Sequence, residues 1–105
     1  MLLKELYDQL HFPEYFGFNW DALFDCLCDL HWIDEYTVVM VHDAWPELNT
    51  HDISIYIEIL IDAIRSWEQP WSDIPDGGRD HEFRVVFPFS CKSEIESRVK
   101  RYHFL

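Results

Sequence analysis

The sequence predicts an α/β fold, and residues 36–87 provide the evidence for it. Two short runs rich in β-branched and apolar residues, 36–41 and 82–87, are typical of strands, and Pro88 stops the second. Between them, residues 49–67 repeat isoleucine and leucine at helical spacing, over a length that favours a helix. Because a strand, a crossover helix and a second strand form one unit, we expect the two strands to be parallel.

The first element is a predicted helix over residues 1–10. Its apolar stripe comprises Leu2, Leu3, Leu6 and Leu10, with Tyr7 beside it. Pro13 ends this helix and begins a turn that carries Tyr15, Phe16 and Phe18. We expect about half of the turn's aromatic side chains to be buried. Gly17 is expected to supply a backbone angle that a residue with a Cβ would resist.

A second helix is predicted from Asn19 to Leu30. Asn19 suits the N-cap, because its side-chain oxygen can accept a hydrogen bond from the first turn. One stripe is apolar and should face a core: Ala22, Leu23, Cys26, Leu27 and Leu30. Another face carries three aspartates four residues apart, here named the acidic row: Asp21, Asp25 and Asp29.

The acidic row is locally unfavourable, because like charges at this spacing each cost about 0.2–0.5 kcal/mol. Asp21 complements the positive end of the helix dipole, whereas Asp29 stands near the negative end. The row is either a solvent-exposed acidic face without a binding role or a surface that binds a cationic partner. Phe24 projects between Asp21 and Asp25, which favours the second interpretation.

The remaining elements complete the predicted sheet and its helices. The run 36–41 is so apolar that we expect a strand covered on both faces. Asn49 or Thr50 can cap the long helix, whose core stripe comprises Ile53, Ile57, Leu60, Ile61 and Ile64. Residues 68–80 are predicted to form an irregular loop. Residues 92–102 predict a final helix, which we expect to cover an exposed face or edge of the small sheet.

Composition limits the function classes. A chain of 105 residues with 49% hydrophobic residues is expected to form a single domain, residues 1–105, with its own core. Its formal charge of −12 is concentrated in one part, because residues 1–64 hold 13 Asp and Glu against Lys4 alone. Such a field repels nucleic acid and anionic membranes and attracts basic proteins.

Several other functions lack support in the sequence. Cys26 and Cys28 would lie about 200° apart on a helix, so they cannot share a metal or a disulfide. The residue types of a cysteine-based catalytic triad are present in Cys91, His42 and Asp43, but no catalytic motif surrounds them. No two histidines have the spacing of metal ligands on a helix. We therefore expect no catalysis, metal or cofactor. Without a signal peptide or a membrane span, the sequence predicts a reduced, cytoplasmic protein.

One stretch carries a family resemblance. Residues 12–27 read Phe-Pro-Glu-Tyr-Phe-Gly-Phe-Asn-Trp-Asp-Ala-Leu-Phe-Asp-Cys-Leu, which resembles the signature of the barstar family of intracellular ribonuclease inhibitors. The resemblance implies that the turn and the second helix plug a nuclease active site, with carboxylates in place of RNA phosphates. By matching positions the contact residues would be Tyr15, Gly17, Asn19, Asp21, Phe24 and Asp25, and the acidic row adds Asp29. A further contact glutamate of the family falls near Asp62.

The chain departs from the family pattern in two places. The family begins with a strand before its first helix, whereas this sequence starts in the helix and adds a helix after the last strand. The resemblance therefore implies a barstar-like α/β fold, with a small parallel sheet packed by helices, over roughly residues 1–90. The expected function is inhibition of a basic ribonuclease, of the immunity or antitoxin type. The alternative is an acidic barstar-like interaction domain whose basic partner is not a nuclease.

Overall fold

The computed structural model describes residues 2–68 and 81–99. Within these ranges the elements follow in the order α1 (Leu2–Gln9), α2 (Trp20–Asp29), β1 (Thr37–Val41), α3 (Thr50–Glu68), β2 (Glu82–Val86), the 3-10 helix η1 (Phe89–Cys91) and α4 (Lys92–Val99). Each helix and strand predicted from the sequence is present. Glu68, the first residue of the loop predicted over residues 68–80, is the last residue of α3. The rest of that loop and the last residues of the predicted final helix lie outside the described ranges.

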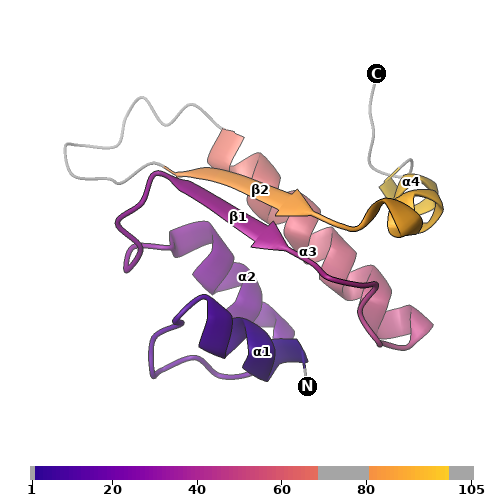
Figure 1. Ribbon diagram of the computed structural model, residues 1–105. Coiled ribbons are helices and arrows are strands. Elements are labelled where there is room, and N and C mark those ends of the chain that lie inside the picture. The colour runs from indigo at the N-terminus through magenta and orange to yellow at the C-terminus, as the bar shows by residue number, and fades with distance from the viewer. Residues whose placement is uncertain (1, 69–80, 100–105) are drawn as a thin grey trace.

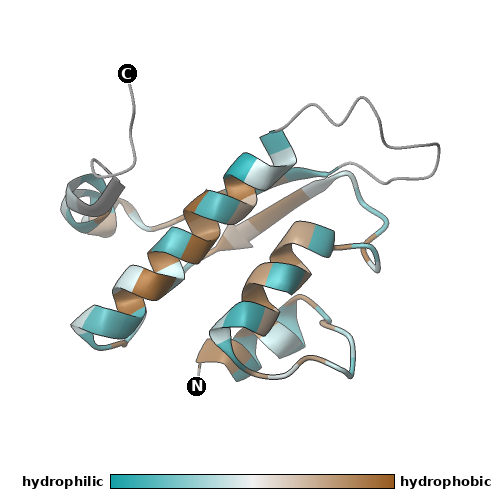
Figure 2. Ribbon diagram, turned by 180° about the vertical axis from the view of Figure 1, so that it is seen from behind, coloured by the Kyte–Doolittle hydropathy of each residue, from teal (hydrophilic) through white to brown (hydrophobic). Residues whose placement is uncertain are grey.

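The strands β1 and β2 form a parallel sheet, as predicted. Their register pairs Thr37 with Glu82 at one end and Val41 with Val86 at the other. Figure 1 shows α3 crossing behind the two strands, and Figure 2, seen from the other side, shows α3 in front of the strands with α2 beside it. The arrangement is therefore a layer of helices on one face of a two-stranded sheet.

The core lies between this helical layer and the sheet. Leu23, Leu27 and Leu30 at α2 are completely buried, as the predicted stripe requires. On α3 the buried positions include the predicted Ile53, Ile57 and Leu60, together with Tyr56 and Ala63. Asn49 caps α3, because its side-chain oxygen accepts a hydrogen bond from the backbone N–H of Asp52 at 2.8 Å. In the described ranges no helix is long and apolar enough to cross a membrane.

The prediction that residues 36–41 are covered on both faces is wrong. Val38 and Met40 point into the core with Phe83 of β2, and all three are buried. The opposite face carries side chains that are 42%, 67% and 45% exposed, those of Val39, Val41 and Val86. The physical reason is that both packing helices, α2 and α3, lie on the same side of the sheet.

The final helix does not cover this exposed face. After β2 the chain turns through η1, and α4 lies beyond the end of the strands (Figure 1). Ile95 packs against the margin of the core, whereas Phe89 in η1 is 84% exposed. In the described residues this helix therefore leaves the outer sheet face open, contrary to one of the two expected positions, and its covering an edge stays a prediction.

A candidate protein-binding surface

The turn before α2 is anchored by two aromatic rings and presents two others. Phe12 and Phe16 are buried, with their ring centroids 4.8 Å apart. Tyr15 is 71% exposed and Phe18 is 42% exposed. Phe18 also packs against Phe16 at 4.9 Å and against Tyr7 of α1 at 5.1 Å. Of the three aromatic residues predicted in the turn, only Phe16 is buried, which is fewer than the expected half, and Tyr15 is exposed as the family resemblance implies.

Gly17 does not have the backbone role predicted for it. Its φ lies outside the left-handed region, and the residue that takes a positive φ, of 51°, is the neighbouring Phe18. The importance of Gly17 is spatial, because a Cβ there would lie 3.1 Å from the side-chain nitrogen of Asn19. The missing side chain therefore leaves room for the Asn19 amide.

Asn19 is the N-cap of α2, as predicted. Its side-chain oxygen accepts a hydrogen bond from the backbone N–H of Ala22 at 2.8 Å. Its side-chain nitrogen donates to the backbone carbonyl of Gly17 at 3.3 Å. One amide thus joins the end of the turn to the first turn of the helix, which fixes the direction in which α2 begins.

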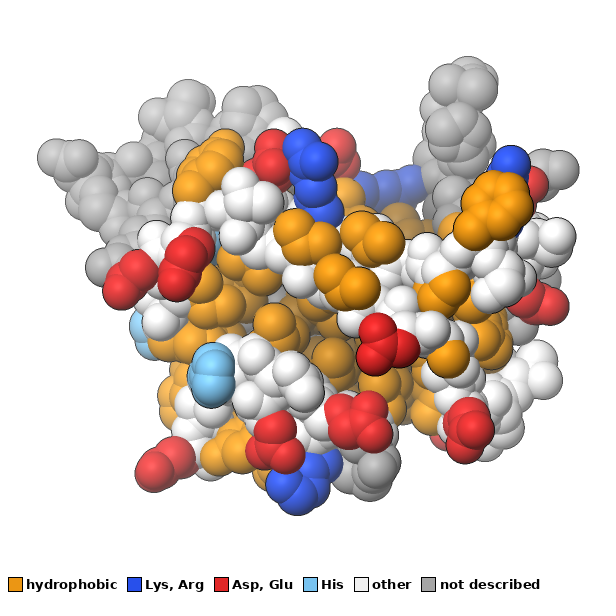
Figure 3. Space-filling view, in the orientation of Figure 1, with side chains coloured by type: hydrophobic (Ala, Val, Ile, Leu, Met, Phe, Trp, Pro, Cys, Tyr) orange, Lys and Arg blue, Asp and Glu red, His pale blue; other side chains and the backbone are white. Residues whose placement is uncertain are grey.

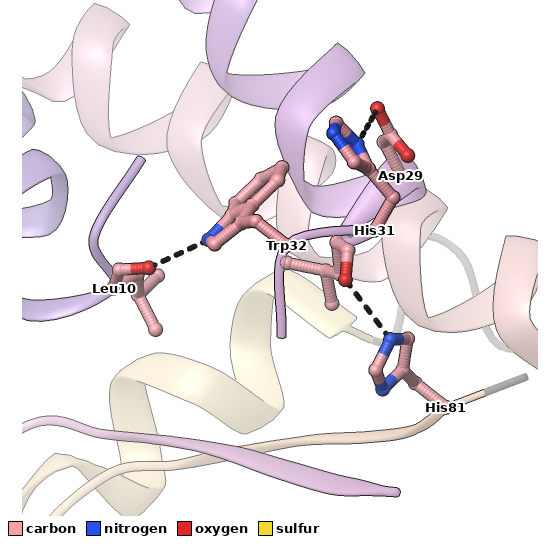
Figure 4. Close-up of polar contacts among 6 residues, drawn as sticks. Leu10, Asp29, His31, Trp32 and His81 are labelled. Atoms are coloured by element: carbon pink, nitrogen blue, oxygen red, sulfur yellow. Dashed lines mark hydrogen bonds and ion pairs between the residues drawn. The ribbon is translucent and has the colours of Figure 1, made fainter. Parts of the chain in front are cut away.

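The acidic row is on the surface. Asp21 and Asp25 are exposed, and neither forms an ion pair within residues 2–68 and 81–99. Asp29 lies at the end of the helix, and its carboxylate is 2.8 Å from Nδ1 of His31, as Figure 4 shows. Phe24, between the first two aspartates in sequence, is half-buried. The carboxylates of Asp21 and Asp25 are thus open to a partner protein, whereas that of Asp29 is paired with His31.

Tyr15 lies within the electrostatic reach of the acidic row. Desolvation and then the negative charges of Asp29 and Cys26 raise the pKa of the Tyr15 hydroxyl. Desolvation, followed by the charges of Asp29 and Asp25, also raises the pKa of the Cys26 thiol. Asp29 of the row therefore acts electrostatically on the Tyr15 hydroxyl.

The acidic surface continues from α2 onto α3. Burial raises the pKa of the Cys28 thiol, a hydrogen bond with Ser66 opposes that shift, and the charges of Asp25 and Asp62 add to it. Asp25 and Asp62 therefore both lie near this thiol, although they are on different helices. Asp62 is exposed and lies on α3, the helix that packs against α2.

The C-terminal half of α2 is held by hydrogen bonds from distant parts of the chain. Trp67 Nε1 donates to the Leu27 carbonyl at 2.7 Å. The buried His81 contacts the Leu30 carbonyl through Nε2 at 3.0 Å and the Glu35 carbonyl through Nδ1 at 2.9 Å. Figure 4 shows His81, which precedes β2, reaching this helix end. Because free carbonyls at a helix end need partners, these contacts stabilise the helix that carries the row.

A further hydrogen bond fixes the segment that follows α2. The indole Nε1 of Trp32 donates to the Leu10 carbonyl at 2.9 Å, which joins this segment to the end of α1 (Figure 4). The Trp32 ring also meets Phe12 edge to face, with 5.7 Å between the ring centroids. The turn and α2 are therefore fixed at both of their ends.

Two residues of this surface were not singled out as contacts from the sequence. Phe18 is partly exposed beside Tyr7, and His31 pairs with Asp29. The sequence could have indicated Phe18 as a contact residue, because Phe18 stands between Gly17 and the N-cap. The sequence could not have indicated the pairing of His31 with Asp29, because that pairing depends on the left-handed backbone at Leu30, whose φ is 49°.

This surface combines carboxylates with exposed aromatic side chains. In the described residues no group of histidine, cysteine and acidic side chains could hold a metal ion. The three cysteines are free, and Cys91 is buried. An array of one charge sign on a rigid helix is suited to binding a cationic protein surface.

Comparison with known proteins identifies the family. The family model described as Barstar (barnase inhibitor) matches residues 1–88. A Bacillus subtilis (strain 168) protein named "Putative ribonuclease inhibitor YrdF" is 27% identical over 86 residues, which cover 82% of this chain and 81% of that protein. No solved structure matches. Members of the matched family inhibit ribonucleases and are not enzymes. This chain belongs to the barstar (barnase inhibitor) family.

Proposed function

We propose that this protein inhibits a ribonuclease by covering the enzyme's cationic active site with α2 and the preceding turn. The observation that carries the proposal is the pair of exposed carboxylates of Asp21 and Asp25, which have no ion-pair partner among the described residues. Residues four apart on a helix are separated by about 6 Å along its axis. Carboxylates at that spacing can take the places of RNA phosphates among the nuclease's lysine, arginine and histidine side chains.

The other residues of the surface have supporting roles in this proposal. Tyr15 and Phe24 supply apolar contact area beside the charges, and aromatic anchors of this kind are enriched at interface centres. Gly17 and Asn19 fix the angle between the turn and the helix. Asp29 and Asp62 extend the negative field toward the nuclease. The family supports a ribonuclease as the target, because the matching model is described as a barnase inhibitor.

We also propose how the fold and the biology relate to this activity. The whole chain, residues 1–105, acts as a single barstar-like domain, with α4 added after the last strand and no counterpart of the family's first strand among the described elements. A protein of this kind serves as the immunity or antitoxin partner of a ribonuclease. Its partner is basic, since residues 1–64 hold nearly all of the excess negative charge.

Titration of the purified protein into barnase, with RNA cleavage as the readout, tests this proposal. Asp25→Ala should weaken inhibition at least tenfold, which corresponds to about 1.4 kcal/mol of binding free energy. Glu94→Ala on α4 removes an exposed carboxylate outside the surface and should leave inhibition unchanged. Equal inhibition by the wild type and Asp25→Ala would contradict the role of the acidic row. No inhibition of barnase or of other basic ribonucleases would favour a basic partner that is not a nuclease.

A further inference from the structure

His31 lies against the last carboxylate of the acidic row. Its Nδ1 is 2.8 Å from a carboxylate oxygen of Asp29, and the two side chains are 60% and 46% exposed (Figure 4). The imidazole ring is also nearly perpendicular to the Trp32 ring, with 5.3 Å between the centroids. Among residues 2–68 and 81–99, these two side chains are the ones that His31 contacts. The imidazole is therefore placed beside one carboxylate and remains open to solvent.

The backbone at Leu30 brings His31 back beside Asp29. Leu30 takes a left-handed conformation, with a φ of 49°, and its N–H donates to the Cys26 carbonyl at 3.0 Å. Because a left-handed backbone is unfavourable for a residue with a Cβ, other contacts must hold it. The Leu30 side chain is completely buried, and its carbonyl oxygen is 3.0 Å from Nε2 of His81. The core therefore fixes the turn that sets His31 against the acidic row.

Positive charge is scarce around the acidic row. Between Lys4 and Arg65 the sequence has no lysine or arginine, so only histidine side chains can become positive there. Figure 3 shows acidic side chains across the lower, helical part of one face, with histidine side chains at its margin. In the part of the chain that the structure describes, His31 is the one histidine that pairs with a carboxylate of the row. Protonation of His31 is thus the step that adds a positive charge to this surface.

Neighbouring segments carry other titratable groups. Trp32 joins this segment to the end of α1 through the Leu10 carbonyl, and four further side chains belong to the adjoining segments: His11, Tyr15, Asp34 and Glu35. None of the four forms an ion pair with His31 in the described ranges. Desolvation and then the charge of Asp29 raise the pKa of Tyr15, so this hydroxyl keeps its proton at neutral pH. Asp29 is therefore the charged group that a proton on His31 affects directly.

We propose that His31 controls, through its own proton, whether Asp29 takes part in binding the nuclease; this inference rests on the proposed function. While the imidazole is uncharged, Nδ1–H donates to one oxygen of Asp29, and the carboxylate keeps its charge for a lysine or arginine of the enzyme. A protonated imidazole neutralises that carboxylate and places a positive charge opposite a cationic active site. Binding of the nuclease and protonation of His31 therefore oppose each other. Since histidine gains its charge between about pH 8 and about pH 5, inhibition should weaken over that range.

The test compares barnase inhibition by the wild type and by His31→Gln, whose side chain can donate a hydrogen bond but cannot gain a charge. At about pH 8 the two inhibition constants should agree within about twofold, because the imidazole is then uncharged. At about pH 5.5 the variant should inhibit at least threefold more tightly than the wild type. The ratio of the two constants removes the titration of barnase itself, because both inhibitors meet the same enzyme. His51→Gln, at an exposed histidine in the first turn of α3, should follow the wild type at both pH values.

Asp29→Asn tests the carboxylate that His31 contacts. It should weaken inhibition at least threefold at about pH 8, where the carboxylate is available to the enzyme, and by a smaller factor at about pH 5.5. Circular dichroism at both pH values checks that each variant is folded. A larger loss at the lower pH would contradict competition between the proton and the enzyme for this carboxylate.

Proton release provides a measurement that a purely structural role would not change. Calorimetry of complex formation at about pH 6, in two buffers of different ionisation enthalpy, should show more protons released by the wild type than by His31→Gln. Equal release, or the same pH profile of inhibition in both proteins, would overturn the role of His31 and leave the proposed function standing. No inhibition by the wild type at about pH 8 would overturn both.

Discussion

Asn19 shows how one side chain sets the geometry of the binding surface. Its amide oxygen caps α2 through the Ala22 N–H, and its amide nitrogen reaches back to the Gly17 carbonyl. Any Cβ at position 17 would crowd this amide, which explains why a glycine suits that position although its φ is ordinary. The cap therefore both satisfies the helix end and positions the row that starts one residue after Trp20.

Replacement of Asn19 tests this role directly. Asn19→Ala should lower the free energy of unfolding by about 1 kcal/mol, because an orphan N–H of the first turn loses its acceptor. Asn19→Asp keeps the oxygen and complements the helix dipole, so it should retain most of the stability. Urea denaturation of the three proteins measures the difference, and an equal loss in both variants would contradict the capping role.

At the scale of elements, the acidic row makes α2 less stable by itself but gives it a negatively charged surface. Its three aspartates repel one another at helical spacing, and described residues provide only His31 as a partner, for Asp29. The helix is held by tertiary contacts instead: three buried leucines and the hydrogen bonds from Trp67 and His81 to carbonyls at its C-terminal end. Packing of an apolar face, rather than intrinsic propensity, thus determines that α2 forms.

His42 connects β1, β2 and α3 at the C-terminal ends of the strands. Its Nδ1 lies 3.1 Å from the Val86 carbonyl, and its Nε2 lies 2.6 Å from the Tyr56 hydroxyl. The ring also stacks on Phe87, with centroids 4.0 Å apart. A neutral ring satisfies both contacts when Nδ1 donates to the carbonyl and Nε2 accepts from the tyrosine. Burial lowers the pKa of His42, although hydrogen bonds to backbone carbonyls and the charge of Asp43 oppose that shift.

The lowered pKa of His42 predicts how stability depends on pH. Between the lowered folded-state pKa and the unfolded value of 6.5, the unfolded chain binds more protons, so stability rises with pH across that window. The contribution of the neutral ring is complete above pH 6.5 and is lost as the pH falls. Urea denaturation from about pH 8 to about pH 5 should therefore show the stability advantage of wild type over His42→Gln shrinking on acidification. A constant difference would contradict this account.

At the scale of the whole molecule, the negative charge is concentrated in the N-terminal part of the chain. The formal charge of −12 arises within residues 1–64, which include α1, α2, β1 and most of α3, whereas the rest of the chain is balanced. The helical face can therefore attract a basic partner from a distance. The outer face of the sheet carries the exposed side chains of Val39, Val41 and Val86.

This distribution predicts a strong salt dependence of the association rate with a basic ribonuclease. Raising the ionic strength from about 0.01 M to about 1 M shortens the Debye length from about 30 Å to about 3 Å. The association rate constant should fall at least tenfold over this range, with a smaller change in the dissociation rate. Stopped-flow or surface-binding kinetics measure both rates. An association rate that does not respond to salt would contradict electrostatic steering by residues 1–64.

The sequence by itself determined the elements, the parallel direction of the strands and the exposed acidic row. These features follow from local periodicity, capping and a crossover connection, which depend on residues close together in the chain. It also identified Asn19 as a cap, but it misassigned the role of Gly17, because the 3.1 Å approach to Asn19 exists only once the turn has folded.

The tertiary structure alone decided which faces are covered. An apolar run such as residues 38–41 does not reveal that both packing helices take the same side of the sheet, so the exposure of Val39 and Val41 was not predicted. Likewise, the proximity of Asp62 to Asp25 and the contact of His81 with Leu30 join residues far apart in sequence. Local patterns specify what each segment can bury, whereas long-range packing chooses which of those surfaces remain open to partners.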